Sequence, residues 1–243
     1  MVSPVTKKTL ENVNFDVDKG LVDIFERKYQ KSNELRDDAG ITAVVNEFAD
    51  KIFANIHSYA VLHELDPIAL ANVSQEFLTA SLTLTNGSLH GMSNINRTKD
   101  VEITYRSAAR ECEIYFPIRL SKLQFTYDYH MIILLIGPQG VITGKINNFE
   151  MDVKLHFDFK TYHAKVLEVS TKNSGHVDLY FDGNGILDLV VDILSEFVTT
   201  ILHPLIALVI EGNIKDVANL VVNVVNEAID NTLFPNSSTL LIL

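Results

Sequence analysis

Apolar and polar residues alternate along much of the chain between residues 78 and 181. The clearest run places apolar side chains at every odd position from Phe149 to Phe159, with charged residues or histidine at the even positions between them. Such alternation buries one face of a strand and leaves the other in water, as in long antiparallel strands. The pattern predicts about six long strands, with alternating segments at residues 82–84, 101–105, 112–120, 123–131, 149–159 and 177–181.

Turn residues mark where the predicted strands end. Gly137-Pro138-Gln139-Gly140 predicts the turn of a hairpin. Ile142 and Ile146 lie at even positions, whereas the apolar residues from Phe149 onward lie at odd positions. A phase change of this kind needs an extra residue, so Asn147-Asn148 is predicted to form a bulge or a bend.

A helical period appears before the strands. Residues 9–65 read mostly as helix, with a polar loop or break at residues 28–40 and an end at Asp66-Pro67. The apolar positions that recur at steps of three and four are Val44, Val45, Phe48, Ile52 and Ile56. Such spacing is typical of a helix that packs one side against a core.

The C-terminal part of the chain predicts two apolar helices, at residues 186–210 and 214–232, with a kink at Pro204 and a break at Gly212-Asn213. The first is long enough to span a bilayer. Three acidic residues interrupt it at steps of four, namely Asp188, Asp192 and Glu196. They would cost roughly 8–10 kcal/mol near a bilayer centre, and their common stripe instead predicts an amphipathic helix with a wide buried side. That side comprises Leu187, Val190, Val191, Leu194, Phe197, Val198, Ile201 and Leu202.

The predicted sheet and the predicted helix each have an apolar face that needs a cover, and each is the obvious cover for the other. The sequence therefore predicts an α+β fold in which a long, strongly curved antiparallel sheet wraps around a long apolar C-terminal helix, with an N-terminal helix. We expect a single domain over residues 1–243. It includes an N-terminal helix or loop extension at residues 1–40 and a C-terminal tail at residues 233–243.

Charge and composition exclude several classes of function. Twenty Lys and Arg residues stand against 31 Asp and Glu, a net charge of −11, which argues against a nucleic-acid partner. A single cysteine, Cys112, excludes an internal disulfide framework and a Cys-rich zinc site. No two histidines lie three or four residues apart, and neither a nucleophile elbow nor a phosphate-binding glycine loop occurs. We therefore expect a non-catalytic protein without a metal or a cofactor.

Aromatic side chains gather on the inward positions of the predicted strands. They are Phe125, Tyr127, Tyr129, Phe149, Phe157, Phe159 and Phe181. Such residues either fill a core or line an apolar cavity between sheet and helix, and the alternation does not distinguish the two. Cys112 lies at an apolar position and is expected to be a small buried hydrophobe. His130 and His156 lie at polar positions and are expected to be solvated.

Several motifs, in order over roughly residues 40–235, resemble the takeout and juvenile-hormone-binding family. They are Gly87-Ser88-Leu89-His90-Gly91 leading to Ile95, Arg97 and Asp100-Val101, the hairpin around Gly137, the stretch Val177-Asp178-Leu179-Tyr180-Phe181-Asp182-Gly183-Asn184-Gly185-Ile186-Leu187, His203-Pro204 and Leu233-Phe234-Pro235. The chain lacks the N-terminal cysteine pair of that family and is in this respect more similar to the group 7 mite allergens. The resemblance implies the tubular lipid-binding (TULIP) fold, and it favours a hollow tube over a filled one.

The resulting hypothesis is a monomeric carrier that holds an apolar small molecule, such as a juvenile-hormone-like terpenoid, a fatty acid or another lipid, in an internal tunnel. The expected lining comprises Phe125, Tyr127, Tyr129, Phe149, Met151, Leu155, Phe157, Leu179, Leu194, Phe197 and Ile201. Tyr127, Tyr129 and Cys112 are the candidate polar groups. The alternative is a closed protein that docks on a membrane or a protein partner through an apolar tip, such as residues 233–243. The resemblance implies secretion, whereas the absence of an apolar leader in this chain is compatible with a cytoplasmic protein.

Overall fold

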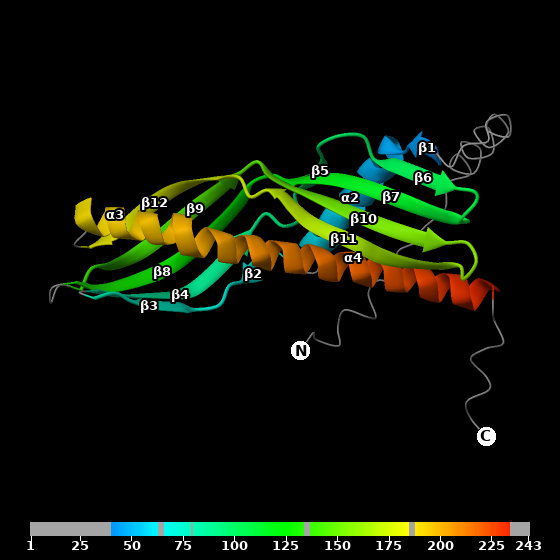
Figure 1. Ribbon diagram of the computed structural model, residues 1–243. Coiled ribbons are helices and arrows are strands. Elements are labelled where there is room, and N and C mark those ends of the chain that lie inside the picture. Colours follow the sequence, from blue (N-terminus) through cyan, green and yellow to red (C-terminus); the bar gives the residue numbers. More distant parts are fainter. Residues whose placement is uncertain (1–39, 63–65, 79, 134–136, 185–187, 234–243) are drawn as a thin grey trace, which may run out of the picture.

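The computed structural model describes residues 40–62, 66–78, 80–133, 137–184 and 188–233. Within this part, twelve strands form two antiparallel sheets that lie end to end along one long helical segment (Figure 1). The predicted fold class is confirmed, because antiparallel strands combine with a long C-terminal helix and an N-terminal helix, α2 (Asn46–Leu62). The strands are divided between two sheets instead of forming one.

Each sheet contains six strands. The first sheet has the order β1-β6-β7-β10-β11, with β5 beside β7, and the second has the order β12-β9-β8-β4-β2, with β3 beside β4. The strands of the first sheet are β1 (Ile41–Val44), β5 (Ile95–Arg97), β6 (Glu102–Arg106), β7 (Glu111–Leu120), β10 (Phe149–Asp158) and β11 (His163–Asn173). Those of the second are β2 (Ile68–Ala69), β3 (Val73–Glu76), β4 (Ala80–His90), β8 (Leu123–Ile133), β9 (Gln139–Asn147) and β12 (His176–Asn184).

The chain passes between the sheets at two neighbouring points. β9 ends in the second sheet and β10 begins in the first, and Asn148 between them has a φ of 59°. On the return, β11 is followed by β12, whose His176 lies opposite Asn147. Gly175 precedes it with a φ of 77°, and a Cβ at this position would collide with the Asn147 carbonyl group. The bend predicted at Asn147-Asn148 is therefore confirmed. The hairpin predicted around Gly137 is confirmed as well, since β8 pairs with β9. Gln139 and Gly140, predicted in its turn, already lie in β9.

One long strand, β11, is missing from the sequence prediction. Its inward residues change phase, because Val169 lies opposite Val153 whereas Val166 lies opposite Leu155. The register shift between Lys154 and Leu155 leaves one extra residue in β11, so the chain shows no sustained alternation there.

The N-terminal prediction also needs correction. The segment just before α2 is strand β1, not helix, and Val44 lies on it with 47% of its surface exposed. The apolar positions Phe48, Ile52 and Ile56 do lie on α2, and Val45, which directly precedes it, is buried. Of the predicted N-terminal extension, residues 1–39 lie outside the described residues.

The C-terminal helical segment is continuous, contrary to the predicted break at Gly212-Asn213. It consists of α3 (Asp188–Phe197), a π-helical turn (Val198–Leu202) and α4 (His203–Leu233). The Asn213 side chain donates a hydrogen bond to the Val209 carbonyl oxygen (2.8 Å), and a Cβ at Gly212 would meet nothing, so neither residue ends the helix. The irregularity lies instead in the wide turn just before Pro204.

The buried side of the helical segment continues through the π-helical turn. Buried residues recur at steps of four before, within and after the turn, namely Val190, Leu194, Val198, Leu202, Ile206, Ile210 and Ile214. Asp188, Asp192 and Glu196 are exposed, as predicted. Ile201, in contrast, is 38% exposed, because a turn with an additional residue rotates it away from the predicted buried side.

Polar side chains of α4 bind the free edge of the first sheet, where β11 has no further strand beside it. The Asn226 amide accepts a hydrogen bond from the Ala164 backbone N–H (2.7 Å) and donates one to its carbonyl oxygen (2.9 Å). Glu211 accepts hydrogen bonds from the Thr171 backbone N–H (3.0 Å) and hydroxyl group (2.8 Å). These contacts fix the helix along β11 and satisfy backbone groups that an edge strand leaves unpaired.

Candidate functional site

The structure divides the predicted lining residues into four sets. Seven are at most 3% exposed in one core cluster formed by both sheets and the C-terminal helical segment: Phe125, Tyr127, Tyr129, Phe149, Met151, Leu194 and Phe197. Leu155 and Leu179 are half-buried at the border of this cluster. Phe157 is half-buried in a second cluster, beside Cys112. Ile201 lies outside both clusters.

The inner face of the second sheet is tightly closed. Phe125, Tyr127 and Tyr129 on β8 are 0%, 3% and 2% exposed. Two of these rings cover glycines of neighbouring strands: a Cβ at Gly144 of β9 would collide with the Phe125 ring, and one at Gly87 of β4 with the Tyr127 ring. The aromatic residues therefore take the space that the glycines leave open, and they fill this half of the core.

The inner face of the first sheet is closed at one end and half-covered at the other. On β10, exposure is 0% at Phe149, 1% at Met151 and 7% at Val153, whereas Leu155 and Phe157 are only half-buried. On β7, Leu120 and Ile118 are likewise buried and Phe116 and Ile114 half-buried, whereas Cys112, opposite Phe157, is buried again. On β11, Val166 and Val169 are both half-buried. We call this region the half-covered face; it comprises Ile114, Phe116, Leu155, Phe157, Val166 and Val169.

Two helices border the half-covered face. On the α2 side, the Phe53 ring packs edge-on against Phe116, with 6.3 Å between ring centroids. On the β11 side, Asn226 holds α4 against Ala164, which lies opposite Phe157. Phe159 continues the face beyond the end of β10, with its ring 4.8 Å from that of Phe157. Val166 and Val169 are missing from the sequence prediction because they belong to the overlooked strand β11.

The three candidate polar groups differ in their surroundings. The Tyr127 hydroxyl donates a hydrogen bond to the Ala71 carbonyl oxygen (2.9 Å). Cys112 is 7% exposed, as predicted, and burial raises the pKa of its thiol to about 11. The Tyr129 hydroxyl is buried and lacks a hydrogen-bond partner in the described part of the chain, and burial raises its pKa.

The geometry above agrees with a family match over residues 44–225, described as group 7 allergen. The chain belongs to the group 7 allergen family. Among solved structures, Epiphyas postvittana Takeout 1 is similar at 15% sequence identity, with a TM-score of 0.36, over 62% of this chain and 78% of that one. No curated protein matches the sequence significantly. The resemblance to the group 7 allergens noted from the sequence is thereby confirmed.

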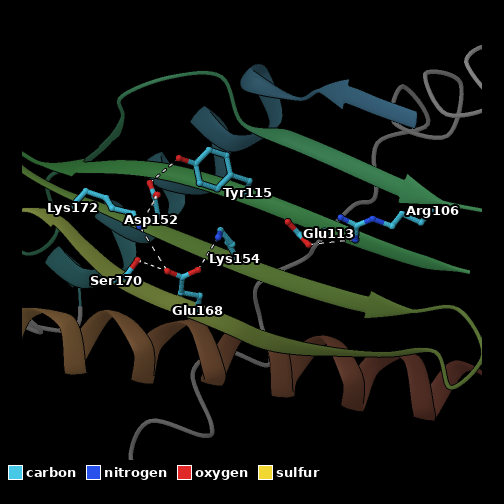
Figure 2. Close-up of polar contacts among 8 residues, drawn as sticks. All are labelled: Arg106, Glu113, Tyr115, Asp152, Lys154, Glu168, Ser170 and Lys172. Atoms are coloured by element: carbon cyan, nitrogen blue, oxygen red, sulfur yellow. Dashed lines mark hydrogen bonds and ion pairs between the residues drawn. The ribbon is translucent and has the colours of Figure 1, made fainter. Parts of the chain in front are cut away.

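In this group 7 family member, the outer side of the first sheet carries a polar network behind the half-covered face (Figure 2). Lys154 of β10 donates to Glu168 of β11 (2.7 Å), which also accepts from the Ser170 hydroxyl (2.8 Å). On the neighbouring strand, the Tyr115 hydroxyl donates to Asp152 (2.9 Å). The network therefore ties β7, β10 and β11 together across the register shift.

The charges of this network shift two pKa values. The hydrogen bond from Lys154, followed by that from Ser170, lowers the pKa of Glu168 to about 2. Burial, followed by the hydrogen bond to Asp152, raises the pKa of Tyr115 to about 12. Glu168 therefore stays ionised, and Tyr115 stays a donor, throughout the neutral range.

One of the two predicted solvated histidines is not solvated. His130 is exposed, but the His156 side chain is only 12% exposed, because β7 and β11 place Glu113 and Lys165 directly beside it. Its Nε2 lies 3.4 Å from a Glu111 carboxylate oxygen. Its Nδ1 is buried and without a hydrogen-bond partner among the described residues.

Two further features bear on the kind of site. A depression of about 490 Å³ lies on the polar side of the second sheet, and its lining comprises Thr83, Thr85, Asp128, Tyr129, His130, Gln139, Gly140, Val141 and Gly183. It is a surface feature and not the predicted tunnel. Within the described ranges, no three His, Cys, Asp or Glu residues are grouped as a metal site.

One described helical segment, Asp188–Leu233, is long and apolar enough to cross a membrane. Its apolar residues Val190, Leu194, Ile206 and Ile210 lie in the main core cluster. Packing against the two sheets therefore accounts for part of this apolar character.

Proposed function

We propose that this group 7 family protein is a non-catalytic carrier that binds an apolar small molecule against the half-covered face. The observation that supports this most strongly is the contrast in burial along β10, from 0% exposure at Phe149 to half-burial at Leu155 and Phe157. Apolar surface that points inward but still meets water is unfavourable by about 25 cal/mol per Å². A ligand that covers it recovers this free energy.

The side chains of the half-covered face favour an acyl or isoprenoid chain as ligand. All six are aliphatic or phenylalanine, so the face offers dispersion contacts and no charge. A ligand that buries roughly 400 Å² would gain about 10 kcal/mol before the costs of association, enough for micromolar binding or better. Fatty acids, terpenoids and other lipids all meet this description.

The proposal predicts saturable uptake of cis-parinaric acid, a fluorescent fatty acid, by the purified full-length protein after organic extraction. Phe157→Ala should weaken this binding about tenfold, because it removes apolar contact area from the face. The matched control is Val141→Ala, which trims an exposed strand residue on the polar side of the second sheet and should leave the affinity unchanged. Native mass spectrometry before extraction should show a co-purifying lipid.

Three outcomes would contradict the proposal. The first is absence of saturable uptake together with absence of a co-purifying lipid. The second is a Val141→Ala effect as large as that of Phe157→Ala, which would place the ligand in the depression on the second sheet. The third is an unchanged affinity in the Phe157→Ala variant.

Secretion and a monomeric state belong to the same proposal. Group 7 family membership supports an extracellular carrier, and a carrier that encloses its ligand alone needs no second subunit. Most of the tail that the sequence suggested as a docking tip, residues 234–243, lies outside the described residues.

A further inference from the structure

Four large apolar side chains are exposed in the turn after β3, near the end of β8 and at the start of α3. Figure 1 shows α3 at the end of the molecule opposite the end where β10 and β11 meet. The exposed fractions are 41% for Phe77, 106% for Leu78, 49% for Ile132 and 53% for Leu189. The strand register brings their segments to one end, because Ile132 lies opposite Ser81 in β4, and the last residue of β12 lies opposite the first of β9. We call these four residues the apolar tip.

The turn between β3 and β4 is unusual in its composition. The Phe77 backbone N–H donates to the Ala80 carbonyl oxygen (2.8 Å), so Phe77 and Leu78 lie in a tight hairpin connection. Such positions are normally taken by Gly, Asn, Asp, Pro or Ser, which supply turn geometry and tolerate water. Leu78 is fully exposed and supports no packing in the described part of the protein. Folding therefore does not account for a leucine here.

The charges near the apolar tip have one sign. The three connecting segments, residues 73–81, 130–140 and 182–190, contain Glu76, Asp182 and Asp188 and no Lys or Arg. Electrostatic attraction to anionic headgroups is therefore absent, and the three carboxylates would oppose it. A surface that binds this end must therefore contain an apolar layer that the side chains can enter, and it must carry no net negative charge.

We propose that the apolar tip docks on an uncharged lipid surface, such as a layer of zwitterionic headgroups, with Phe77 and Leu78 inserted below the headgroups. Apolar side chains at a protruding end partition into the interfacial region of a bilayer in proportion to the area that they bury.

A second copy of the chain fits the tip less well than a lipid layer does. The four residues together expose roughly 500 Å² of apolar surface, since a large side chain presents about 200 Å². A standard protein interface needs about 800 Å² from each partner. A lipid layer needs no complementary shape, so three separate connections can insert side by side.

The absence of tryptophan from the chain gives a direct test. Leu78→Trp places a single fluorophore at the fully exposed turn, where folding should tolerate it, and circular dichroism checks this. With phosphatidylcholine vesicles its emission should shift to the blue and be quenched by brominated acyl chains. The matched control is Leu208→Trp, at a leucine of α4 that is 66% exposed away from the tip, and it should show neither effect.

A second variant measures the contribution of the turn itself. Phe77→Ser combined with Leu78→Ser should lower vesicle partitioning in a flotation assay by roughly tenfold or more, because two inserted side chains lose their apolar area. The same variant should bind cis-parinaric acid normally in the absence of vesicles, so failure of the docking proposal and failure of the carrier proposal are distinguishable.

Several results would overturn the docking proposal. They are an unshifted emission of Leu78→Trp with vesicles, an equal shift for Leu208→Trp, and partitioning that the double serine variant leaves unchanged. A shift that needs phosphatidylserine would replace the uncharged surface with an anionic one. A shift that grows with protein concentration in the absence of lipid would replace the lipid surface with a second copy of the chain.

Discussion

Strand β8 of the second sheet and strand β10 of the first have the same alternating pattern, yet only β8 is buried on its inward side along its whole length. In β8 the inward aromatic rings cover glycines of the flanking strands, and their exposure stays at 3% or below. In β10 beyond Val153, and at Val166 and Val169 of β11, the inward apolar side chains are only half-buried. Alternation thus decides which side of a strand faces inward, but the elements above that side decide how completely it is covered.

The cause of the difference lies in the helix. The buried positions of the helical segment recur at steps of four from Val190 to Ile214, and all of these lie in the main core cluster. The next buried residue, Val222, lies outside both core clusters. Farther on, α4 follows the edge strand β11 and is held there by Asn226, so its apolar residues cover the sheet margin instead of its centre. The half-covered face is what remains between this margin and α2.

The largest expected effect concerns the closed region. Phe125→Ala should lower the free energy of unfolding by about 3–5 kcal/mol, because it leaves a cavity above Gly144. Phe157→Ala should cost less, about 1–2 kcal/mol, since part of that side chain already meets water. Urea denaturation of both variants measures the contrast, and equal losses would remove the distinction between the two regions.

Substitutions that enlarge an inward side chain should also affect the free energy of unfolding differently in the second sheet and on the half-covered face. Gly144→Ala should destabilise the protein by about 1–3 kcal/mol, because the new methyl group collides with the Phe125 ring. A second substitution, Phe125→Leu, should recover part of the loss by making room for it. If the double variant is no more stable than Gly144→Ala alone, the collision with the ring is not the cause.

The same kind of change on the half-covered face should be tolerated. Val166→Phe should alter the free energy of unfolding by less than about 1 kcal/mol, because this side chain has space to grow. It should nevertheless reduce cis-parinaric acid uptake by occupying the ligand position. Thermal unfolding and a binding titration on one sample test both, and a large destabilisation would indicate that the face is packed.

The smallest expected effect lies on the outer side of the first sheet. Because the folded-state pKa of Glu168 is about 2 and thus below its ordinary value, its stabilising contribution is full above pH 4.5 and is lost as pH falls toward 2. Glu168→Gln should flatten the fall in melting temperature across this range. Ser170→Ala, which removes the weaker hydrogen bond, should have an intermediate effect, and an unchanged profile in both variants would contradict the assignment.

Much of the fold could be predicted from the sequence, because its main strands alternate without interruption. β8 begins at Leu123 as predicted, and the bend at Asn148 follows from the phase change. β11 was not predicted, because a register shift interrupts its alternation. The exposure of Ile201 was not predicted either, because it follows from a π-helical turn that has no recognisable sequence pattern. Leu155 and Phe157 of the candidate site were predicted, whereas Val166 was not, because its strand was missed.

The contacts of Asn226 and Glu211 with β11 have a consequence for assembly. Backbone amides at Ala164 and Thr171 that would otherwise template an incoming strand are already bonded within the same molecule. Helix α4 thus protects the sheet from edge-to-edge aggregation in addition to covering the core. A chain truncated before residue 211 would lack both Glu211 and Asn226. Its β11 edge would then be free to pair with strands of other molecules, which favours fibril formation.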